Sequence, residues 1–271
     1  MVSHLISDRQ TQTPIWQWQA GDSLPYLTCS LLQAWPHGFF TQPFYPRTPE
    51  SLTEILHPEA IAYRLKQVHG NRVLTPAEIA AEGLNEGFSS ADGLIANQAK
   101  QSIWVASADC TPVLIGDVET GNIAALHAGW RGTAQRIVPE AIARLQVWGS
   151  SLENLRIALG PAISGEVYQV SIEVAAEVGA SLFKKEEIDG LESILTPLQA
   201  VSAPPILPDP EVGKVRLDVR RVNQLQLEQL GIEPEQIAIA PYCTYQSPSH
   251  FFSYRRTQEK KVQWSGIVKD C

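Results

Sequence analysis

Three residues in the middle of the chain have side chains that bind transition metals. Cys110 follows one apolar run and His127 ends the next, and GDVETGN between these runs has the composition of a hairpin turn. His69 lies upstream in KQVHGNRV, beside a turn at Gly70 and Asn71. Two histidines and one cysteine are a common ligand set for zinc, with the fourth position left to water or substrate. We therefore predict that His69, Cys110 and His127 hold one metal ion.

Zinc suits these ligands better than copper. A blue-copper site adds a weak axial methionine to two histidines and a cysteine, and the only methionine here is Met1. A multicopper oxidase needs many more imidazoles than the six histidines of this chain provide. Zinc with three protein ligands lowers the pKa of a bound water toward about 7. We expect one zinc ion, and copper is the less favoured metal.

The same residues also allow interpretations without a metalloenzyme. An isolated histidine is often satisfied by a backbone group, and a free cysteine mostly behaves as a small buried hydrophobe. In a metal-free cysteine hydrolase, Cys110 would be the thiolate nucleophile and His127 its base. A zinc-binding protein without enzymatic activity is a third alternative.

Charged residues near the ligands indicate how a substrate could be handled. Asp109 precedes Cys110, where burial of an acid is costly without a partner or a function, and Asp109 and Asp92 are candidates for proton transfer. Arg131 lies in a Gly-Trp-Arg-Gly turn before a predicted helix, whose N-terminus attracts anions. With Arg255 from a predicted closing strand, Arg131 could bind an anion. The alternative for both arginines is solvation at the surface or a structural ion pair.

The elements that position these residues combine buried strands with amphipathic helices. The hairpin makes part of the sheet antiparallel, so the fold class expected is α/β (α+β), a mixed β-sheet with flanking helices. Helices begin at the candidate caps Thr133, Ser171 and Asp218. Pro139 lies deep in a helix that starts at Thr133, so this helix either begins near Ile137 or is kinked in its first turns. The predicted strands are residues 64–74 (turned at Gly70), 102–108, 112–117, 122–128, 155–163, 237–240 and 250–256; the predicted helices are residues 51–63, 133–148, 171–183 and 217–232.

Residues 1–271 are expected to form a single domain. Its first 50 residues are expected to be irregular, because proline and bulky aromatic residues alternate there without a clean period. Residues 184–215 contain five prolines and are expected to be a surface excursion within the domain.

Composition excludes several classes of protein. A net charge of -8 argues against binding to nucleic acid or to anionic membranes, and no apolar run reaches the roughly 18 residues that span a bilayer. Four widely spaced cysteines suit reduced thiols, so cytoplasmic residence is expected. The usual phosphate-binding glycine loops are absent. The expected partners are small molecules, and the oligomeric state is left open.

Six blocks in this order resemble the YfiH family, also called the laccase-domain or polyphenol-oxidase family: KQVHGNRV, ADGLIA, ADCTPVLIGD, IAALHAGWRG, LGPAI and FFSYRR. The resemblance covers roughly residues 60–260. It implies a fold related to the catalytic domains of bacterial deamidating toxins, which are cysteine hydrolases. It also implies one zinc on the residues that match His69, Cys110 and His127.

The activity that the resemblance implies is phosphorolysis of purine nucleosides, namely adenosine, inosine and methylthioadenosine, together with deamination of adenosine. A peptidoglycan-editing role is also attached to the family, and the sequence offers no chemical feature that bears on it. Two segments depart from the family pattern. The chain has QPFYPRTPE from Gln42 and TQEKKVQW after FSYRR, where the family carries an arginine before Gly-Gly-Val-Ser and a Thr-Gly-Arg. The substrate range is therefore less secure than the metal site.

Overall fold

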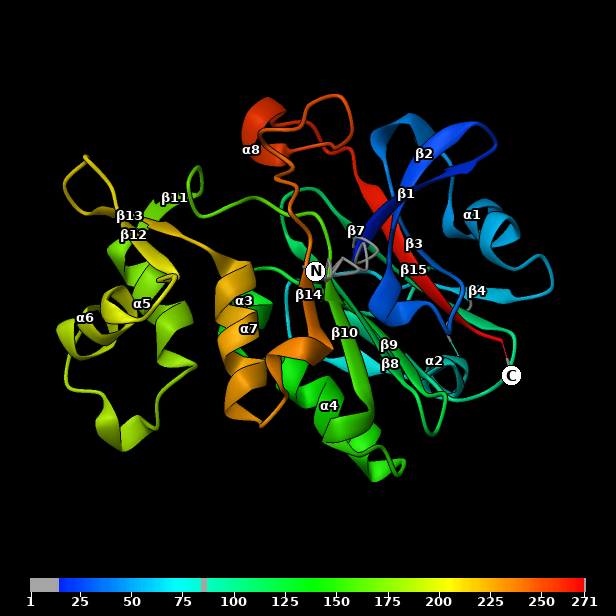
Figure 1. Cartoon of the computed structure of the whole chain (residues 1–271), viewed down its shortest axis with the longest axis horizontal. Coiled ribbons are helices and arrows are strands. Elements are labelled where there is room, and N and C mark those ends of the chain that lie inside the picture. The colour runs from blue at the N-terminus through cyan, green and yellow to red at the C-terminus, as the bar shows by residue number, and fades with distance from the viewer. Residues whose placement is uncertain (1–14, 84–86, 271) are drawn as a thin grey trace, which may run out of the picture.

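The computed structural model describes residues 15–83 and 87–270 of the chain. Two six-stranded sheets pack face to face, and a three-stranded sheet forms a lobe beside them, on the left of Figure 1. The first sheet has the order β1 (Trp16–Gly21), β2 (Leu24–Cys29), β3 (His37–Phe40), β15 (Gln263–Lys269), β7 (Gln101–Ser107), β4 (Ile61–Tyr63). The second has the order β14 (Ile237–Ile239), β10 (Leu155–Leu159), β8 (Thr111–Asp117), β9 (Ile123–Ala128), β6 (Gly93–Ala96), β5 (Val73–Leu74). The lobe has the order β11 (Gln169–Ser171), β13 (Lys214–Leu217), β12 (Ile206–Pro208).

Both large sheets contain parallel and antiparallel pairs, so the predicted mixed α/β class is confirmed, but the chain forms three sheets where one was predicted. In the second sheet β8 and β9 form an antiparallel hairpin, whereas β10 and β14 run parallel. Every residue of β8 and β9 is buried, as expected for strands covered on both faces. Their two faces contribute to different cores. Leu114 shares one core with Ile103 of the first sheet, and Val113 shares the other with the helices outside.

Helices cover the outer faces of both large sheets. The buried stripe of α4 (Ile137–Val147), with α7 (Val219–Gln229), packs on the second sheet. α1 (Pro49–Leu56) packs on the first sheet, where Leu52 shares a core with Phe40 and Trp104. Asp218 caps α7 as predicted, because its carboxylate accepts hydrogen bonds from backbone N–H groups in the first turn. No helix in the described part of the chain combines the length and apolar character needed to cross a membrane.

The predicted cap at Thr133 is wrong. A short helix, α3 (Trp130–Ala134), follows β9 and contains Thr133, and α4 starts separately after Arg136, which has a left-handed φ of 62°. Pro139 therefore lies in the first turn of α4. Backbone N–H groups in the first turn have no carbonyl partner within the helix, so proline costs no hydrogen bond there.

The N-terminal region from residue 15 onward is not irregular, and the residues before it lie outside the described part. β1 and β2 form a hairpin at the edge of the first sheet, paired over all six residues of each strand. The period-2 pattern was present as WQWQ at Trp16 to Gln19. Because the hairpin lies at the sheet edge and much of it is exposed, its apolar pattern is weak, and irregular chain was predicted instead.

Residues 184–215 are also more regular than predicted. They contain α6 (Glu192–Ala200) and β12, which pack with α5 (Ile172–Ala180) to form the core of the lobe. Ser171 caps α5 as predicted, accepting from the N–H of Val174. Pro208 is tolerated because β12 is an edge strand, which leaves one side without ladder bonds.

One predicted strand is confirmed only at its end, and another is wrong. Only residues 73–74 of the predicted strand 64–74 form a strand, because backbone groups at residues 68–70 bond to a carboxylate instead of a neighbouring strand. Residues 250–256 lead into α8 (Tyr254–Thr257), capped by Ser253, and the closing strand is β15. Arg255 therefore lies on a helix.

Candidate metal centre

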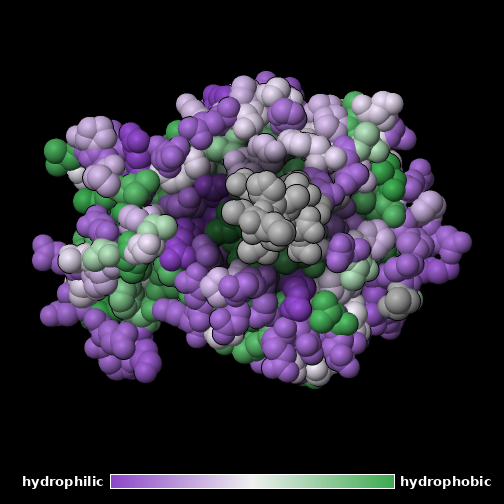
Figure 2. Space-filling model, viewed as in Figure 1, coloured by the Kyte–Doolittle hydropathy of each residue, from purple (hydrophilic) through white to green (hydrophobic). Residues whose placement is uncertain are grey.

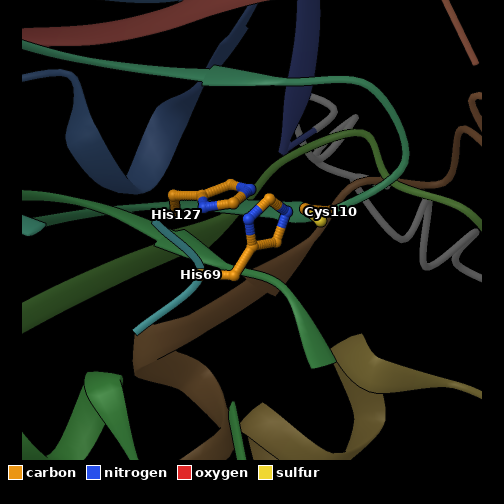
Figure 3. A group of neighbouring side chains, drawn as sticks. All are labelled: His69, Cys110 and His127. Atoms are coloured by element: carbon orange, nitrogen blue, oxygen red, sulfur yellow. The ribbon is translucent and has the colours of Figure 1, made fainter. Parts of the chain in front are cut away.

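The structure brings His69, Cys110 and His127 together. Their ligand atoms all lie within 4.8 Å of one another, and Figure 3 shows both imidazole rings and the thiol pointing toward one centre. His127 is buried on β9, Cys110 lies in the turn where the chain crosses from β7 to β8, and His69 is exposed. The donor set of two nitrogens and one sulfur fits a tetrahedral ion held at about 2.0 to 2.3 Å from each ligand.

Asp92 orients two of the three ligands from a fully buried position. Its carboxylate accepts hydrogen bonds from the backbone N–H groups of Val68, His69 and Gly70 at 3.1, 2.9 and 2.8 Å. These bonds hold His69 at a left-handed φ of 61°. Asp92 Oδ1 also lies 2.9 Å from His127 Nδ1, so this nitrogen donates and Nε2 is left free for a metal.

The charges of the centre are coupled. Desolvation raises the pKa of the Cys110 thiol, but the charge of His127 and hydrogen bonds from both histidines outweigh it and lower the value to about 6. Burial lowers the pKa of His127, whereas the Cys110 thiolate and Asp92 raise it to about 9. A thiolate is the form of cysteine that binds metal. Both shifts favour a thiolate facing an imidazolium when no metal is bound.

Gly129 leaves room for the sulfur. A Cβ at this position would lie 2.8 Å from Cys110 Sγ and 3.4 Å from His69 Cδ2. A Cβ at Gly132, about one turn later, would lie 2.8 Å from the carbonyl oxygen of Gly70. The two glycines of HAGWRG therefore let α3 approach the ligands closely.

Asp109 has structural partners at both carboxylate oxygens. It accepts a hydrogen bond from the Thr244 hydroxyl and one from the backbone N–H of Arg255, each at 2.7 Å. Its left-handed φ of 94° shapes the turn that carries Cys110. The structure thus gives the buried acid the partners that its burial requires, and these bonds tie α8 to the ligand turn.

Arg131 and Arg255 each pack on an aromatic ring near the centre. The guanidinium of Arg131 lies 4.1 Å from the ring centre of Trp130, and that of Arg255 lies 4.8 Å from the ring centre of Tyr168. Arg255 also donates to the carbonyl oxygen of Gln169 at 2.8 Å. Burial and the nearby Cys110 thiolate raise the pKa of Tyr168 to about 12, although both arginines oppose this shift.

The ligands form the floor of a cleft of about 330 Å³. Its walls are mainly apolar and its rim is charged, a combination typical of small-molecule sites. The walls include Leu65, Ala106, Ala108, Val262 and Trp264, and the rim includes Tyr254, Glu259, Lys260 and Lys261. Sequence reasoning assigned none of these residues to the site. For those between Glu259 and Trp264, the only signal was their position in the segment after FSYRR that departs from the family pattern.

A larger cleft of about 650 Å³ lies between the lobe and the second sheet, away from the ligands. Figure 2 shows hydrophilic residues where the surface is hollowed between the lobe and the large sheets. The guanidinium groups that line this cleft are already engaged. Arg220 pairs with Asp218, and Arg221 pairs with Glu228, both at 2.9 Å. The chemistry therefore points to the smaller cleft.

Relatives of known name resemble this chain over most of its length. A family model described as multi-copper polyphenol oxidoreductase laccase matches residues 50–268. A purine nucleoside phosphorylase of Synechocystis sp. is 54% identical over 256 residues, which cover 94% of this chain and 97% of that protein. An adenosine deaminase from an unknown prokaryotic organism is 27% identical over 179 residues, covering 66% of this chain and 59% of that protein.

Solved structures share the fold. YlmD from Geobacillus stearothermophilus aligns with a TM-score of 0.76 over 95% of this chain and 99% of that chain, at 22% identity. The hypothetical protein YfiH from Bacillus licheniformis aligns with a TM-score of 0.72 over 90% and 96%, also at 22% identity.

Fold and site together define a mixed α/β protein with a His-Cys-His ligand set at the floor of a cleft. The chain belongs to the YfiH or laccase-domain family. Relatives with enzyme names support an enzyme of this family.

Proposed function

We propose that the chain is a zinc-dependent purine nucleoside phosphorylase that also deaminates adenosine. The observation that carries the proposal is the convergence of His69, Cys110 and His127 below apolar walls that suit a flat base. The name of the Synechocystis relative supports phosphorolysis, and the name of the more distant relative supports deamination. Residence in the cytoplasm and the absence of a nucleic-acid partner stay predictions.

His69, Cys110 and His127 would hold the zinc, and Asp92 would keep the His127 ring in position. The bound ion would supply electrophilic activation in a site that water and substrate can reach. Copper is less suitable, because the described residues around the three ligands contain no thioether.

The two reactions place different demands on the cleft. In phosphorolysis, a phosphate oxygen forms a bond to ribose C1′ while the bond from C1′ to the base nitrogen breaks. The electron pair leaves with the base, which then takes up a proton. In deamination, water adds at C6 of adenine and ammonia leaves. The proposed roles of Arg131 and Arg255 in binding the phosphate, and of Asp109 in proton transfer, stay predictions. The bonds of Asp109 to Thr244 and Arg255 favour a positioning role.

A metal-free cysteine hydrolase is the second candidate, as the kinship with deamidating toxins would imply. In this candidate the nucleophile is Cys110, the base is His127, and Asp92 orients the base. The lowered pKa of the Cys110 thiol is typical of an activated nucleophile. Metal binding and thiolate chemistry need the same sulfur, so one experiment separates them. Rapid alkylation of Cys110 in metal-free, fully active protein would favour the hydrolase.

The test is turnover of adenosine, inosine and methylthioadenosine by zinc-loaded protein, with and without phosphate. We expect free base and ribose 1-phosphate only when phosphate is present, and ammonia from adenosine in either condition. Chromatography follows all three products. No turnover of any nucleoside by protein with a full complement of zinc would overturn the proposed function and leave a non-enzymatic zinc protein as the explanation of the site.

A further inference from the structure

The segment between α8 and β15 lies over the rim of the metal-ligand cleft. It leaves α8 at Gln258, which has a left-handed φ of 59°, and its next three residues all line the cleft. Lys261 pairs with Glu259 at 3.1 Å, so these two charges neutralise each other. Among the described residues, Lys260 has neither an ion pair nor a hydrogen bond through its side chain. Within that part of the chain, Lys260 is therefore the free cation at the rim of this cleft.

From this arrangement we propose that Lys260 binds the phosphate co-substrate; this inference rests on the proposed phosphorolysis. Its ammonium group is a compact charge on a flexible stem, which suits a ligand that must enter and leave. Glu259 is neutralised by Lys261, so the attraction for a phosphate at the rim comes from Lys260.

Gln67 and Arg255, near the cleft, are already used, whereas the buried hydroxyl of Ser107, which also lines the cleft, has no hydrogen-bond partner among the described residues. Gln67 donates to the carbonyl oxygen of Ala106 at 2.8 Å and accepts from its N–H at 2.7 Å. Arg255 donates to Gln169, and neither Arg255 nor Arg131 is among the residues that line this cleft. Among the described side chains that line this cleft, the unpaired cation is therefore Lys260.

The apolar walls and the charged rim of the cleft suit different substrates. Trp264, Val262 and Leu65 present apolar surface below the rim, where a purine ring would be desolvated. Phosphate cannot occupy that surface, because nothing there replaces its hydration. The proposal places the base against these walls and the phosphate beside Lys260 at the rim, and a phosphate oxygen forms its bond to ribose C1′ as the base departs.

The experiment measures the KM for phosphate with inosine as the nucleoside. Lys260→Ala is expected to raise this KM by about 3- to 10-fold, the effect of losing one partly exposed charge contact. Lys260→Glu should raise it further, and Lys260→Arg should restore it largely. Phosphorolysis at low phosphate should fall more than deamination of adenosine, which consumes no phosphate. Lys185→Ala, an exposed lysine on the lobe, is the matched control and should change neither activity.

The outcomes distinguish the proposed role of Lys260 from the proposed phosphorylase function. If the unaltered protein phosphorolyses inosine and Lys260→Ala leaves the KM for phosphate unchanged, the inference is wrong and the function stands. The inference is equally wrong, and the function still stands, if Arg131→Ala alone raises that KM. If the unaltered protein neither turns over nucleosides nor binds phosphate in calorimetry, both fail. Phosphate binding without turnover, unchanged by Lys260→Ala, also overturns the inference.

Discussion

The floor and the rim of the cleft are built in different ways. The floor takes Cys110 and His127 from the ends of buried strands and fixes His127 through the buried carboxylate of Asp92. The rim takes Glu259 and Lys260 from an exposed segment that follows a helix of four residues. A change at the floor must disturb several hydrogen bonds, whereas a change at the rim disturbs few.

This difference implies a division of tasks. A site held by packing and hydrogen bonds is preorganised, so the floor would set which metal binds and which chemistry follows. An exposed segment tolerates substitution, so the rim would set which substrates are accepted. Floor variants should therefore change metal binding and both reactions together, and rim variants should change substrate preference. The floor can be tested through its reactivity, its metal affinity and its packing.

The largest expected effect concerns the reactivity of Cys110. In chelator-treated protein, iodoacetamide should label Cys110 with a midpoint near pH 6, because its lowered pKa keeps the thiolate as pH falls toward that value. At pH 7 this gives roughly 100 times more thiolate than an ordinary thiol of pKa near 9. Buried Cys29, whose pKa is raised to about 11, should stay unlabelled. Mass spectrometry of peptides locates the label, and labelling that rises only near pH 9 would show that His127 does not stabilise the thiolate.

Asp92→Asn should weaken zinc binding by about 10- to 100-fold, the usual effect of removing the carboxylate behind a ligating histidine. The amide leaves His127 free to change tautomer and weakens the bonds to the backbone around His69. Competition with a chromophoric chelator measures the affinity. Asp117→Asn is the matched control, because Asp117 is equally buried but its carboxylate bonds to its own turn and to Ser150 rather than to the ligands. Equal losses in both variants would mean that Asp92 supports the fold in general.

A smaller effect is expected for Gly129→Ala. The added methyl group would lie 2.8 Å from Cys110 Sγ, so the sulfur must shift, and we expect a loss of metal affinity of a few fold. Gly70→Ala is the control, since its new methyl group meets no atom closer than 3.7 Å. The same chelator competition applies. An unchanged affinity in Gly129→Ala would show that the ligand turn is less rigid than the rest of the floor.

Much of the floor could be predicted from the sequence, because its signals are local and chemical. The apolar runs around Cys110 and His127 indicated the hairpin, and their residue types indicated the ligand set. The role of Asp92 could not be predicted in the same way, because three of the four groups that bond to its carboxylate lie more than 20 residues upstream and the fourth, His127, lies on β9.

The rim and the edges of the fold were harder to predict. The strand expected at residues 250–256 is a loop and a short helix, because Ser253 caps a turn that the aromatic pair before it obscured. Irregular chain was predicted for the edge hairpin of β1 and β2 and for residues 184–215 of the lobe, since exposed faces and prolines weaken the apolar period there. Lys260 reaches the cleft only through tertiary packing, and no spacing in the sequence indicates it.

The most direct test of the central claim is the metal content of protein purified without added metal. Elemental analysis should find about one zinc per chain, and Cys110→Ala should lose that zinc together with nucleoside turnover. Cys243→Ala, which removes a buried thiol that accepts from the N–H of Ser164, should keep both. Full activity in protein that contains neither zinc nor another metal would contradict the account.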